Sequence, residues 1–329
     1  MAEPPMNGHD ARISSPVPHP SDHGGDAESV AHVLGMAVED ILDLSISMNP
    51  LAPDVASLVA GAAGAARRYP DARVATEALA EVLGVNGRQL LLTNGGAEAI
   101  ALVAGDLATA QIVEPEFSLW RRHLARVAPV VGKFGGGRVR SNPNNPTGRL
   151  ADVDETATVW DEAFYQLATG QWTRGDVEHG AIVVGSLTKL FACPGLRLGY
   201  VLSANPQVIE RLGQRQARWS VNSIALAVAP RLLADAPLVK WAHEVGELRT
   251  SLAVTLRSYG LRVEVADAPW VLVTGVRGLR DALARRAVLV RDCANFGLKD
   301  TVRIAVPAPA ALERLTSALD GAVGEVSWE

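Results

Sequence analysis

The amino-acid sequence predicts an α/β protein in which a large domain is followed by a smaller C-terminal α+β domain. Up to about residue 204, short apolar strand segments alternate with helical segments, which is typical of a mixed, mostly parallel sheet covered by helices on both faces. Beyond that point, long helical segments lead into four short strand segments, which indicates the second domain. The chain has 329 residues, 48% of them hydrophobic, and is therefore long enough to form both cores.

The elements are expected in the following order. The N-terminal part should contain a helix at 27–38 and an extended segment at 41–54. The large domain should contain strands at 89–94, 111–115, 128–131, 138–142, 156–160, 181–185 and 198–203, and helices at 55–66, 74–84, 96–107 and 117–126. After residue 204 we expect helices at 205–216, 221–234, 238–258, 278–286 and 309–320, and strands at 262–265, 269–274, 287–291 and 301–306. We place the domains at 49–220 and 221–329, with residues 1–48 as an arm and a segment that joins the small domain.

Composition and charge exclude several function classes. The net charge of −5 gives no basic surface of the kind that binds nucleic acid. The cysteines, Cys193 and Cys293, and the dispersed histidines match neither a disulfide framework nor metal-ligand spacing. No apolar run approaches the roughly 18 residues of a membrane span, and the N-terminal 25 residues lack the apolar region of a signal peptide. We therefore expect a cytoplasmic protein with no bound metal, no nucleic-acid partner and no membrane contact.

A lysine marks the first candidate site. The chain has only four lysines, and Lys189 directly follows the apolar strand segment 181–185. Ser186 and Thr188 place hydroxyls beside it, and Arg197 follows after a Pro-Gly turn. Because α/β sheets bind ligands at the ends of their strands, this group can form an anion site around a reactive amine. The ordinary alternative is a surface lysine whose stem covers apolar side chains.

Other segments supply what a lysine-bound pyridoxal phosphate requires, namely a carboxylate for the ring nitrogen, anion ligands, a donor for the phenolic oxygen and a flat side chain for the ring. Asp161 ends an apolar strand, and the segment TNGGAEAI can present the N–H groups of Ala97 and Glu98 to a phosphate. Asn145 lies in the turn-forming run SNPNNPTGR, and Phe117 begins a helix. Each has a structural alternative as a helix cap, an ordinary turn, a loop or a core residue.

Two other functions fit part of the pattern. Residues 186–189 match the S-x-x-K nucleophile of penicillin-binding enzymes, and residues 220–222 match the S-x-N motif of that group. No K-T-G follows them, so the match is too short to carry the assignment. A protein of the same fold could also serve as a non-catalytic sensor or scaffold, although no added module is visible in the sequence.

Four motifs occur together: N-P-N-N-P-T-G, D-E-A-F, S-x-T-K and P-G-L-R-x-G. On these motifs the chain resembles fold-type I pyridoxal-phosphate enzymes of the class I/II aminotransferase superfamily, from residue 23 to about residue 319. Within it, the chain is similar to histidinol-phosphate aminotransferases and still more to the threonine-phosphate decarboxylases of cobalamin synthesis. The resemblance implies a large domain with a mixed sheet, a small C-terminal domain and a pyridoxal 5′-phosphate cofactor.

The resemblance also implies a role for each candidate residue. Lys189 would bind the cofactor covalently and move protons, Asp161 would pair with the ring nitrogen, and Asn145 would donate to the phenolic oxygen. Phe117 would stack on the ring, and the cofactor phosphate would be held by Ala97, Glu98, Ser186, Thr188 and Arg197, with Tyr69 reaching it from a partner subunit. A homodimer with shared active sites is therefore expected. The substrate would contact Arg303 through its carboxylate, Arg291 through a phosphate, and also His23 and Gly24.

Two departures from the family pattern affect these expectations. Phe164 stands where transaminating relatives usually have a tyrosine that donates to the phenolic oxygen, so electron withdrawal by the ring should be weaker. Tyr165, its neighbour, is expected to point elsewhere. The chain between Gly148 and Asp161 is also too short for the usual helix, so we expect that helix to be absent or a single turn, with one face of the sheet exposed.

The choice of reaction depends on which Cα bond is held perpendicular to the cofactor ring, an angle that a sequence does not show. Three features favour the decarboxylases: the HGG segment at 23–25, the D-E-A-F motif and the segment VRDCANFG at 290–297. We therefore expect decarboxylation of a phosphorylated amino acid, with L-threonine O-3-phosphate giving aminopropanol phosphate as the first candidate. The alternative is transfer of an amino group to 2-oxoglutarate, as in histidinol-phosphate aminotransferases.

Overall fold

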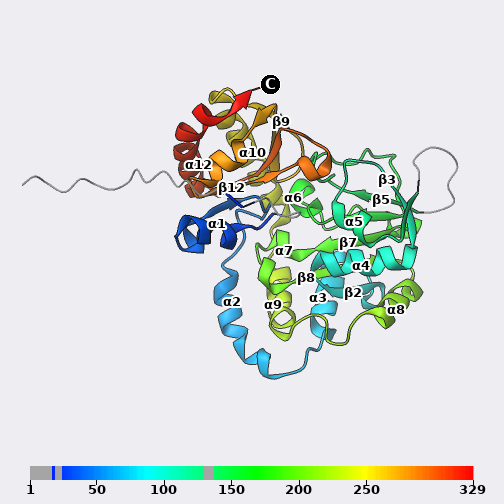
Figure 1. Cartoon of the computed structure of the whole chain (residues 1–329). Coiled ribbons are helices and arrows are strands. Elements are labelled where there is room, and N and C mark those ends of the chain that lie inside the picture. The colour runs from blue at the N-terminus through cyan, green and yellow to red at the C-terminus, as the bar shows by residue number, and fades with distance from the viewer. Residues whose placement is uncertain (1–16, 19–23, 129–136, 329) are drawn as a thin grey trace, which may run out of the picture.

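The computed structural model describes residues 17–18, 24–128 and 137–328 (Figure 1). The rest of the N-terminal arm, His23 and most of the strand expected at 128–131 lie outside these residues. The described residues form two large sheets with helices packed against them, as the alternating pattern of the sequence predicts, and a further two-stranded ribbon. None of the helices in the described segments is both long and apolar enough to cross a membrane.

The large sheet has seven strands and is mixed but mostly parallel, as expected. Its order is β2 (Leu90–Asn94), β8 (Leu198–Ser203), β7 (Ile182–Ser186), β6 (Val159–Asp161), β5 (Gly137–Ser141), β3 (Thr109–Ile112) and β4 (Arg126–Ala128). Only β8 runs antiparallel to its neighbours β2 and β7. The carboxyl ends of β5, β6 and β7 therefore lie side by side at one edge of the sheet.

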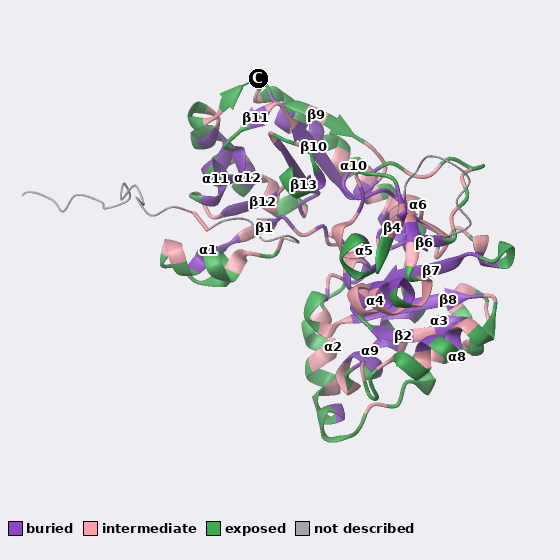
Figure 2. Cartoon of the chain, turned by 45° about the vertical axis from the view of Figure 1, so that its right-hand side comes forward, coloured by how far each residue is buried: buried purple, intermediate pink, exposed green. Residues whose placement is uncertain are grey.

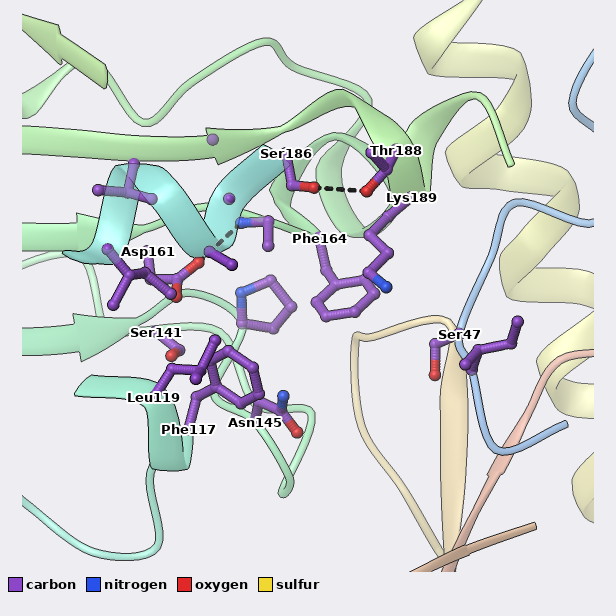
Figure 3. A pocket seen from close by; sticks show the side chains of 18 of the residues that line it. Ser47, Phe117, Leu119, Ser141, Asn145, Asp161, Phe164, Ser186, Thr188 and Lys189 are labelled. Carbon is purple, nitrogen blue, oxygen red and sulfur yellow. Dashed lines mark hydrogen bonds between the residues drawn. The ribbon is translucent and has the colours of Figure 1, made fainter. Parts of the chain in front are cut away.

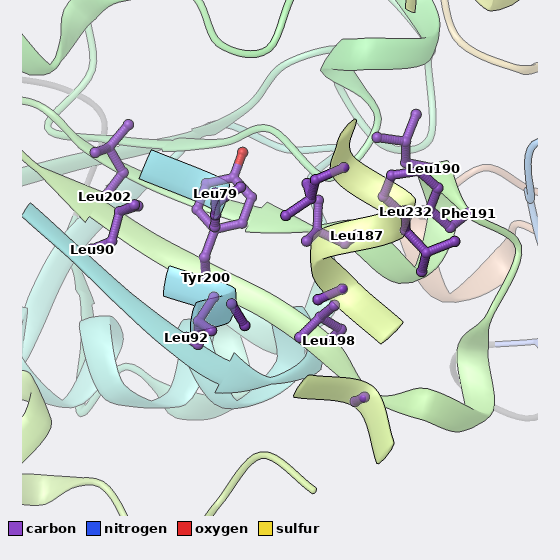
Figure 4. Close-up of a cluster of buried hydrophobic side chains, with 14 of the residues drawn as sticks. Leu79, Leu90, Leu92, Leu187, Leu190, Phe191, Leu198, Tyr200, Leu202 and Leu232 are labelled. Carbon is purple, nitrogen blue, oxygen red and sulfur yellow. The ribbon is translucent and has the colours of Figure 1, made fainter. Parts of the chain in front are cut away.

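Helices cover both faces of this sheet. One face packs against α4 (Gly95–Leu107), α5 (Ser118–His123) and α8 (Pro206–Arg215) around Trp120 and Val184. The other packs against α3 (Arg73–Leu83), α6 (Tyr165–Thr169), α7 (Leu187–Leu190) and α9 (Ser223–Ala234), and Figure 4 shows part of that core around Leu79 and Tyr200. Helix α2 (Val55–Ala62) packs on α9. The central strands β7 and β8 are buried along their whole length (Figure 2).

The small domain is built on a five-stranded sheet. Its order is β1 (Leu42–Leu44), β12 (Val288–Asp292), β13 (Thr301–Ala305), β10 (Trp270–Thr274) and β9 (Arg262–Val265). Helices α10 (Leu238–Ser258), α11 (Leu279–Ala284) and α12 (Pro309–Ala322) enclose its core, and α1 (Ala27–Leu34) packs beside β12. A two-stranded ribbon joins β11 (Val276–Arg277) to β14 (Ser327–Trp328). Short 3-10 turns lie at 38–40, 63–67, 87–89, 176–179, 194–196, 294–296 and 323–325.

Several expected boundaries are wrong for local reasons. The first helix ends at Leu34, because Gly35 adopts a left-handed conformation with φ of 65°. The strand expected at 111–115 ends at Ile112, since the Glu114 carboxylate accepts from the Glu116 N–H and turns the chain. The extended segment expected at 41–54 contains one short strand, at 42–44. The strand expected at 156–160 begins at Val159.

The expectation of a missing helix between β5 and β6 is confirmed, because residues 142–158 contain no helix. Arg174 occupies part of that space, with its guanidinium 4.7 Å from the centre of the Trp160 ring. It also donates from Nη2 to the carbonyl oxygens of Asp152, Val153 and Glu155, each at 2.9 Å. Trp160 is fully buried as a result, so the expected exposure of this face is wrong at that position.

Candidate active site

A cavity of about 250 Å³ opens at the carboxyl ends of β5, β6 and β7, beside the small domain (Figure 3). It brings together most of the residues singled out in the sequence: Ala97, Phe117, Asn145, Asp161, Ser186, Thr188, Lys189, Arg197 and Arg303. These side chains come from six separate segments between residues 97 and 303, so only the folded chain assembles them. The convergence of one amine, two carboxyl-or-amide groups and two guanidinium groups makes this cavity the candidate active site.

Lys189 lies in the short helix α7, three residues beyond the end of β7, and its side chain extends into the cavity (Figure 3). Burial lowers the pKa of this amine to about 8, and the positive charges of Arg303 and Arg197 act in the same direction. Asp43 opposes them weakly. The neutral, nucleophilic form of the amine is therefore available close to neutral pH.

The hydroxyls and N–H groups near Lys189 form a cradle for an anion. The hydroxyl oxygens of Ser186 and Thr188 are 2.8 Å apart, and both residues line the cavity (Figure 3). Helix α4 begins beside them, so the free N–H groups of its first turn, including that of Ala97, face the same space. Arg197 lies over this helix start, where Gly95, with φ of 72°, has no Cβ to collide with its guanidinium.

The Glu98 side chain is not part of the cavity wall. Its carboxylate accepts from the Asn94 N–H at 2.7 Å and from Gln216 Nε2 at 2.8 Å, and it also accepts from the Ser220 hydroxyl. Glu98 therefore fixes the start of α4 to the segment before α9, and only its backbone N–H belongs to the helix start.

Asp161 ends β6 and is buried at the cavity wall. Its carboxylate accepts from the Trp120 Nε1–H at 3.0 Å and from the Ala163 N–H at 3.2 Å. Burial raises the pKa of Asp161 to about 6, and these two hydrogen bonds limit the rise. A cation placed next to this carboxylate would keep it ionised, and the site therefore favours a positively charged group there.

Asn145 and Arg303 form the side of the cavity next to the small domain. Arg303 Nη1 donates to Asn145 Oδ1 at 2.7 Å, which leaves the amide nitrogen of Asn145 as the donor that can serve the cavity. Arg303 Nη2 donates to the carbonyl oxygen of Ser45 at 3.1 Å. Both of these hydrogen-bond partners in the described part of the chain are neutral. They therefore do not neutralise the buried Arg303 guanidinium, whose positive charge can bind an anionic ligand.

Phe117 and Phe164 supply the apolar walls. Both line the cavity (Figure 3), and Phe164 contacts Trp270 edge to face, with 4.8 Å between ring centroids and 80° between planes. Tyr165 is buried away from the cavity, as expected, and its pKa is raised by burial and by the nearby Glu162. No hydroxyl stands at the position of Phe164.

The structure does not bring every expected residue to the cavity. Tyr69 is 77% exposed and its ring lies 4.5 Å from that of Trp219, which is also exposed. Arg291 is buried behind the wall as the strand partner of Arg303, stacks over Phe296 at 5.4 Å and donates to Asn295 at 3.2 Å. Gly24 lies against Ser45.

Sequence reasoning missed several residues of the site. Gly96, Ser141 and Ser47 line the cavity, and the Ser47 hydroxyl is buried with no hydrogen-bond partner in the described residues. Glu116 accepts from the Ser141 N–H at 2.8 Å and from the Phe117 N–H at 2.7 Å, and burial raises its pKa to about 7. In the sequence, Glu116 could have been recognised as a charged residue directly before Phe117, in a segment that leads to the site.

The cavity suits pyridoxal phosphate on the chemistry of its groups. An amine with a lowered pKa, a buried carboxylate and an anion cradle lie around one space, with the amide of Asn145 on its far side. Gly185 in the cavity wall makes room for the Tyr200 ring in the core behind it, because a Cβ at Gly185 would overlap that ring. Within the described residues, no cluster of three or more His, Cys, Asp or Glu side chains could hold a metal ion.

Comparison with known proteins gives a consistent result. The sequence profile of the family "Aminotransferase class I and II" matches residues 139–320. The chain is 28% identical to the histidinol-phosphate aminotransferase of Symbiobacterium thermophilum, over 92% of this chain and 95% of that protein. It is 29% identical to the threonine-phosphate decarboxylase of Salmonella typhimurium, over 91% of this chain and 96% of that protein.

Solved structures show the same fold. The histidinol-phosphate aminotransferase of Sinorhizobium meliloti, solved in complex with pyridoxal-5′-phosphate, matches 97% of this chain and 99% of its own, with a TM-score of 0.79 at 19% identity. The family match covers more than half of the chain, and the relatives match almost all of it. The chain therefore belongs to the aminotransferase class I and II family of fold-type I, pyridoxal-phosphate-dependent enzymes.

Proposed function

We propose that this enzyme decarboxylates a phosphorylated amino acid, with L-threonine O-3-phosphate as the first candidate and aminopropanol phosphate as the product. The observation that carries the proposal is the pair of buried arginines, Arg303 and Arg291, on directly paired positions of β13 and β12. The two neighbouring positive charges attract anionic groups, and this substrate carries a carboxylate and a phosphate. The decarboxylase among the relatives supports the same choice.

The cofactor, when bound, supplies an electron-withdrawing ring that stabilises negative charge on the substrate Cα. Lys189 holds it and then exchanges a proton at Nζ, for which a pKa of about 8 is well placed. Asp161 stabilises positive charge at the ring nitrogen, and Asn145 donates from its amide to the phenolic oxygen. Arg197, Ser186, Thr188 and the start of α4, with the backbone of Glu98, hold the phosphate.

The substrate arginines set the bond that breaks. Arg303, which lines the cavity, orients the carboxylate. Arg291, its strand partner behind the cavity wall, turns from Phe296 toward the cavity to hold the phosphate end, so that both ends of the substrate, and with them the Cα torsion, are fixed. Gly24 lies against Ser45, whose carbonyl oxygen accepts from Arg303, and we propose it as a further substrate contact. The same role expected for His23 falls outside the described residues. Phe164 leaves the phenolic oxygen without a tyrosine donor, which supports decarboxylation over transamination.

We predict that the purified enzyme releases CO₂ and a primary amine from phosphothreonine with no 2-oxo acid present. The reason is that decarboxylation returns the cofactor to its starting state, whereas transamination needs an acceptor for the amino group. Mass spectrometry of the product, with trapped ¹⁴CO₂ from carboxyl-labelled substrate, measures this. Product that forms only with 2-oxoglutarate, together with an equal amount of glutamate, would identify an aminotransferase instead.

The aminotransferase is the second candidate, because a histidinol-phosphate aminotransferase matches the chain about as well as the decarboxylase does. Histidinol phosphate plus 2-oxoglutarate is therefore the second substrate set for the same assay. A borohydride-reducible absorption band above 380 nm would at the same time exclude both a cofactor-free scaffold and an S-x-x-K acylase.

We also propose a two-fold homodimer in which Tyr69 completes the partner's phosphate site. The Tyr69 ring is exposed, contacts Trp219 on the surface of its own subunit and does not line the cavity of that subunit. Tyr69→Ala and Lys189→Ala proteins should each be inactive, and an equal mixture after subunit exchange should recover about a quarter of the wild-type activity, since half of the dimers then hold one intact site. Absence of recovery in verified mixed dimers would show self-contained sites.

A further inference from the structure

A cluster of aromatic side chains extends from the wall of the active site, where Phe164 lies, into the small domain behind it. Its rings are Phe164 from the large domain and Trp270 and Phe296 from the small domain, and we call these three residues the aromatic cluster. Trp270 is 1% exposed and is the first residue of β10. The two substrate arginines proposed above each rest on a ring of this cluster, with Arg303 over Trp270 and Arg291 over Phe296.

Trp270 makes three contacts that reach different parts of the site. Its ring lies 4.8 Å from the Arg303 guanidinium carbon, and its edge-to-face contact with Phe164 links it to the strand end that carries Asp161. Its Nε1–H donates to the carbonyl oxygen of Pro146 at 2.8 Å. The indole therefore joins the small domain to two segments of the large domain.

These contacts close a ring of interactions. Pro146 follows Asn145, whose Oδ1 accepts from Arg303 Nη1 at 2.7 Å, while Arg303 lies on Trp270. Each member thus limits the movement of the next: the indole fixes the backbone of the Asn145 loop, the loop fixes the guanidinium, and the guanidinium lies on the indole. Gly148 allows this close approach, since a Cβ there would lie 3.3 Å from the indole nitrogen.

The chemical nature of the group that supports Arg303 affects the charge of its guanidinium. Burial lowers the pKa of Arg303 to about 10, with a further contribution from Arg291, yet the guanidinium remains charged at neutral pH. A carboxylate in the place of the indole would orient Arg303 but would also neutralise it. An aromatic face attracts the cation without bringing a negative charge, so the charge stays available to a substrate carboxylate.

We propose that Trp270 is a positioning residue for substrate binding: its indole face and Nε1–H hold Arg303 and the Asn145 loop in register without neutralising the arginine. This inference rests on the proposed function in one respect, namely that Arg303 binds the substrate carboxylate. It adds a specificity determinant to the site, because the direction of the guanidinium decides where that carboxylate lies.

The test uses the holoenzyme with three variants. Trp270→Leu removes both the aromatic face and the donor, Trp270→Phe keeps the face only, and Val271→Ala is the matched control. Val271 is equally buried on the next position of β10, but it faces the opposite core. The probe is 3-phosphonopropionate, which carries a carboxylate and a phosphonate but no amine and so cannot react, and its binding is measured by calorimetry. KM and kcat for phosphothreonine and the cofactor absorbance are measured in parallel.

We expect Trp270→Leu to weaken probe binding at least tenfold with full cofactor occupancy, and Trp270→Phe to recover most of that loss. Val271→Ala should lower the melting temperature while leaving the probe affinity within about twofold of wild type. Equal probe affinities for Trp270→Leu and Val271→Ala would overturn the inference, as would a wild-type protein that does not bind the probe. A wild type that binds the probe but does not turn over phosphothreonine would refute the proposed reaction and leave the role of Trp270 standing.

Discussion

Replacing Lys189 with alanine is expected to abolish the covalent attachment of pyridoxal phosphate and to lower turnover by several orders of magnitude. In the proposed assignment the Lys189 amine is the nucleophile that holds the cofactor, and among the described residues no other lysine lines the cavity. The cofactor-free variant should remain folded. Burial and the positive charges of Arg303 and Arg197 disfavour the charged form of the Lys189 amine, so removing this amine does not remove a stabilising charge. Borohydride reduction followed by peptide mass spectrometry measures the attachment, and thermal unfolding measures the fold.

The matched control is Lys240→Ala. Lys240 lies on the surface of α10, 3.8 Å from Glu244, so its loss should change neither the adduct nor the activity. A reduced adduct on a peptide that contains Lys133, Lys240 or Lys299 would contradict the assignment of the cofactor to Lys189.

The same amine gives a pH dependence with a defined direction. Its pKa lies at about 8 instead of 10.5, so the neutral form increases as the pH rises through 8. The rate of cofactor attachment to the cofactor-free protein should therefore rise over this range and level off above pH 9. Stopped-flow absorbance measures it, and a rate that still rises steeply above pH 9 would show that the burial of Lys189 does not lower its pKa.

The second large effect is expected for Asp161→Asn, which should lower turnover roughly 100-fold or more while the cofactor still binds. The substitution keeps the shape of the side chain but removes the negative charge that stabilises a protonated ring nitrogen. The cofactor remains held by Lys189, Arg197 and the start of α4, so its retention should change far less. Arg197→Ala should show the reverse pattern, with cofactor loss as the main effect.

Asp161→Asn should raise the stability of the folded protein although it lowers the activity. The folded-state pKa of Asp161 is raised by burial to about 6 from 3.8, so the folded protein binds the proton more tightly than the unfolded chain does. This group therefore favours folding below pH 4 and costs stability as the pH rises to 6 and beyond. Without cofactor at pH 7, Asp161→Asn should unfold with a free energy about 1–2 kcal/mol higher than wild type, after the loss of one hydrogen bond is subtracted.

Chemical denaturation of the cofactor-free proteins between pH 4 and pH 8 measures this difference. The gap between the two proteins should open from pH 4 to 6 and then stay constant. A constant gap over the whole range would show that Asp161 is not titrating in the folded protein. Asp106→Asn is a useful comparison, since its pKa is lowered by Arg211 and its loss should destabilise the protein instead.

The sequence predicts the fold and the centre of the site because both are encoded in local patterns. Apolar runs such as 181–185 match the buried strand β7, and Lys189, Ser186 and Thr188 follow from its end within four residues. Predicted boundaries failed where a side chain binds the backbone of a nearby residue, as the Glu114 carboxylate does when it accepts from the Glu116 N–H after β3. Local sequence patterns do not show whether a side chain will bind a nearby backbone N–H and so end a strand.

The supporting residues could not be predicted, because their partners are distant in sequence. Trp120 reaches Asp161 across 41 residues, and Trp270 reaches Pro146 across 124. A tryptophan in an amphipathic segment is indistinguishable from an ordinary core residue until the strands are placed. The direction of Arg291, behind the wall and not in it, is equally a result of strand register.

The short connection between β5 and β6 has a consequence for the synthesis of the chain. Its backbone carbonyl groups are bound by Arg174, which lies 19 residues or more after them and beyond β6 itself. On the ribosome, residues 152–155 therefore emerge before the side chain that fixes them, and they have no helix of their own to shield them. The Glu155 carboxylate can bind Arg138 and Arg140 of the preceding strand at once, whereas the three carbonyl groups acquire their hydrogen bonds only after Arg174 has been synthesised.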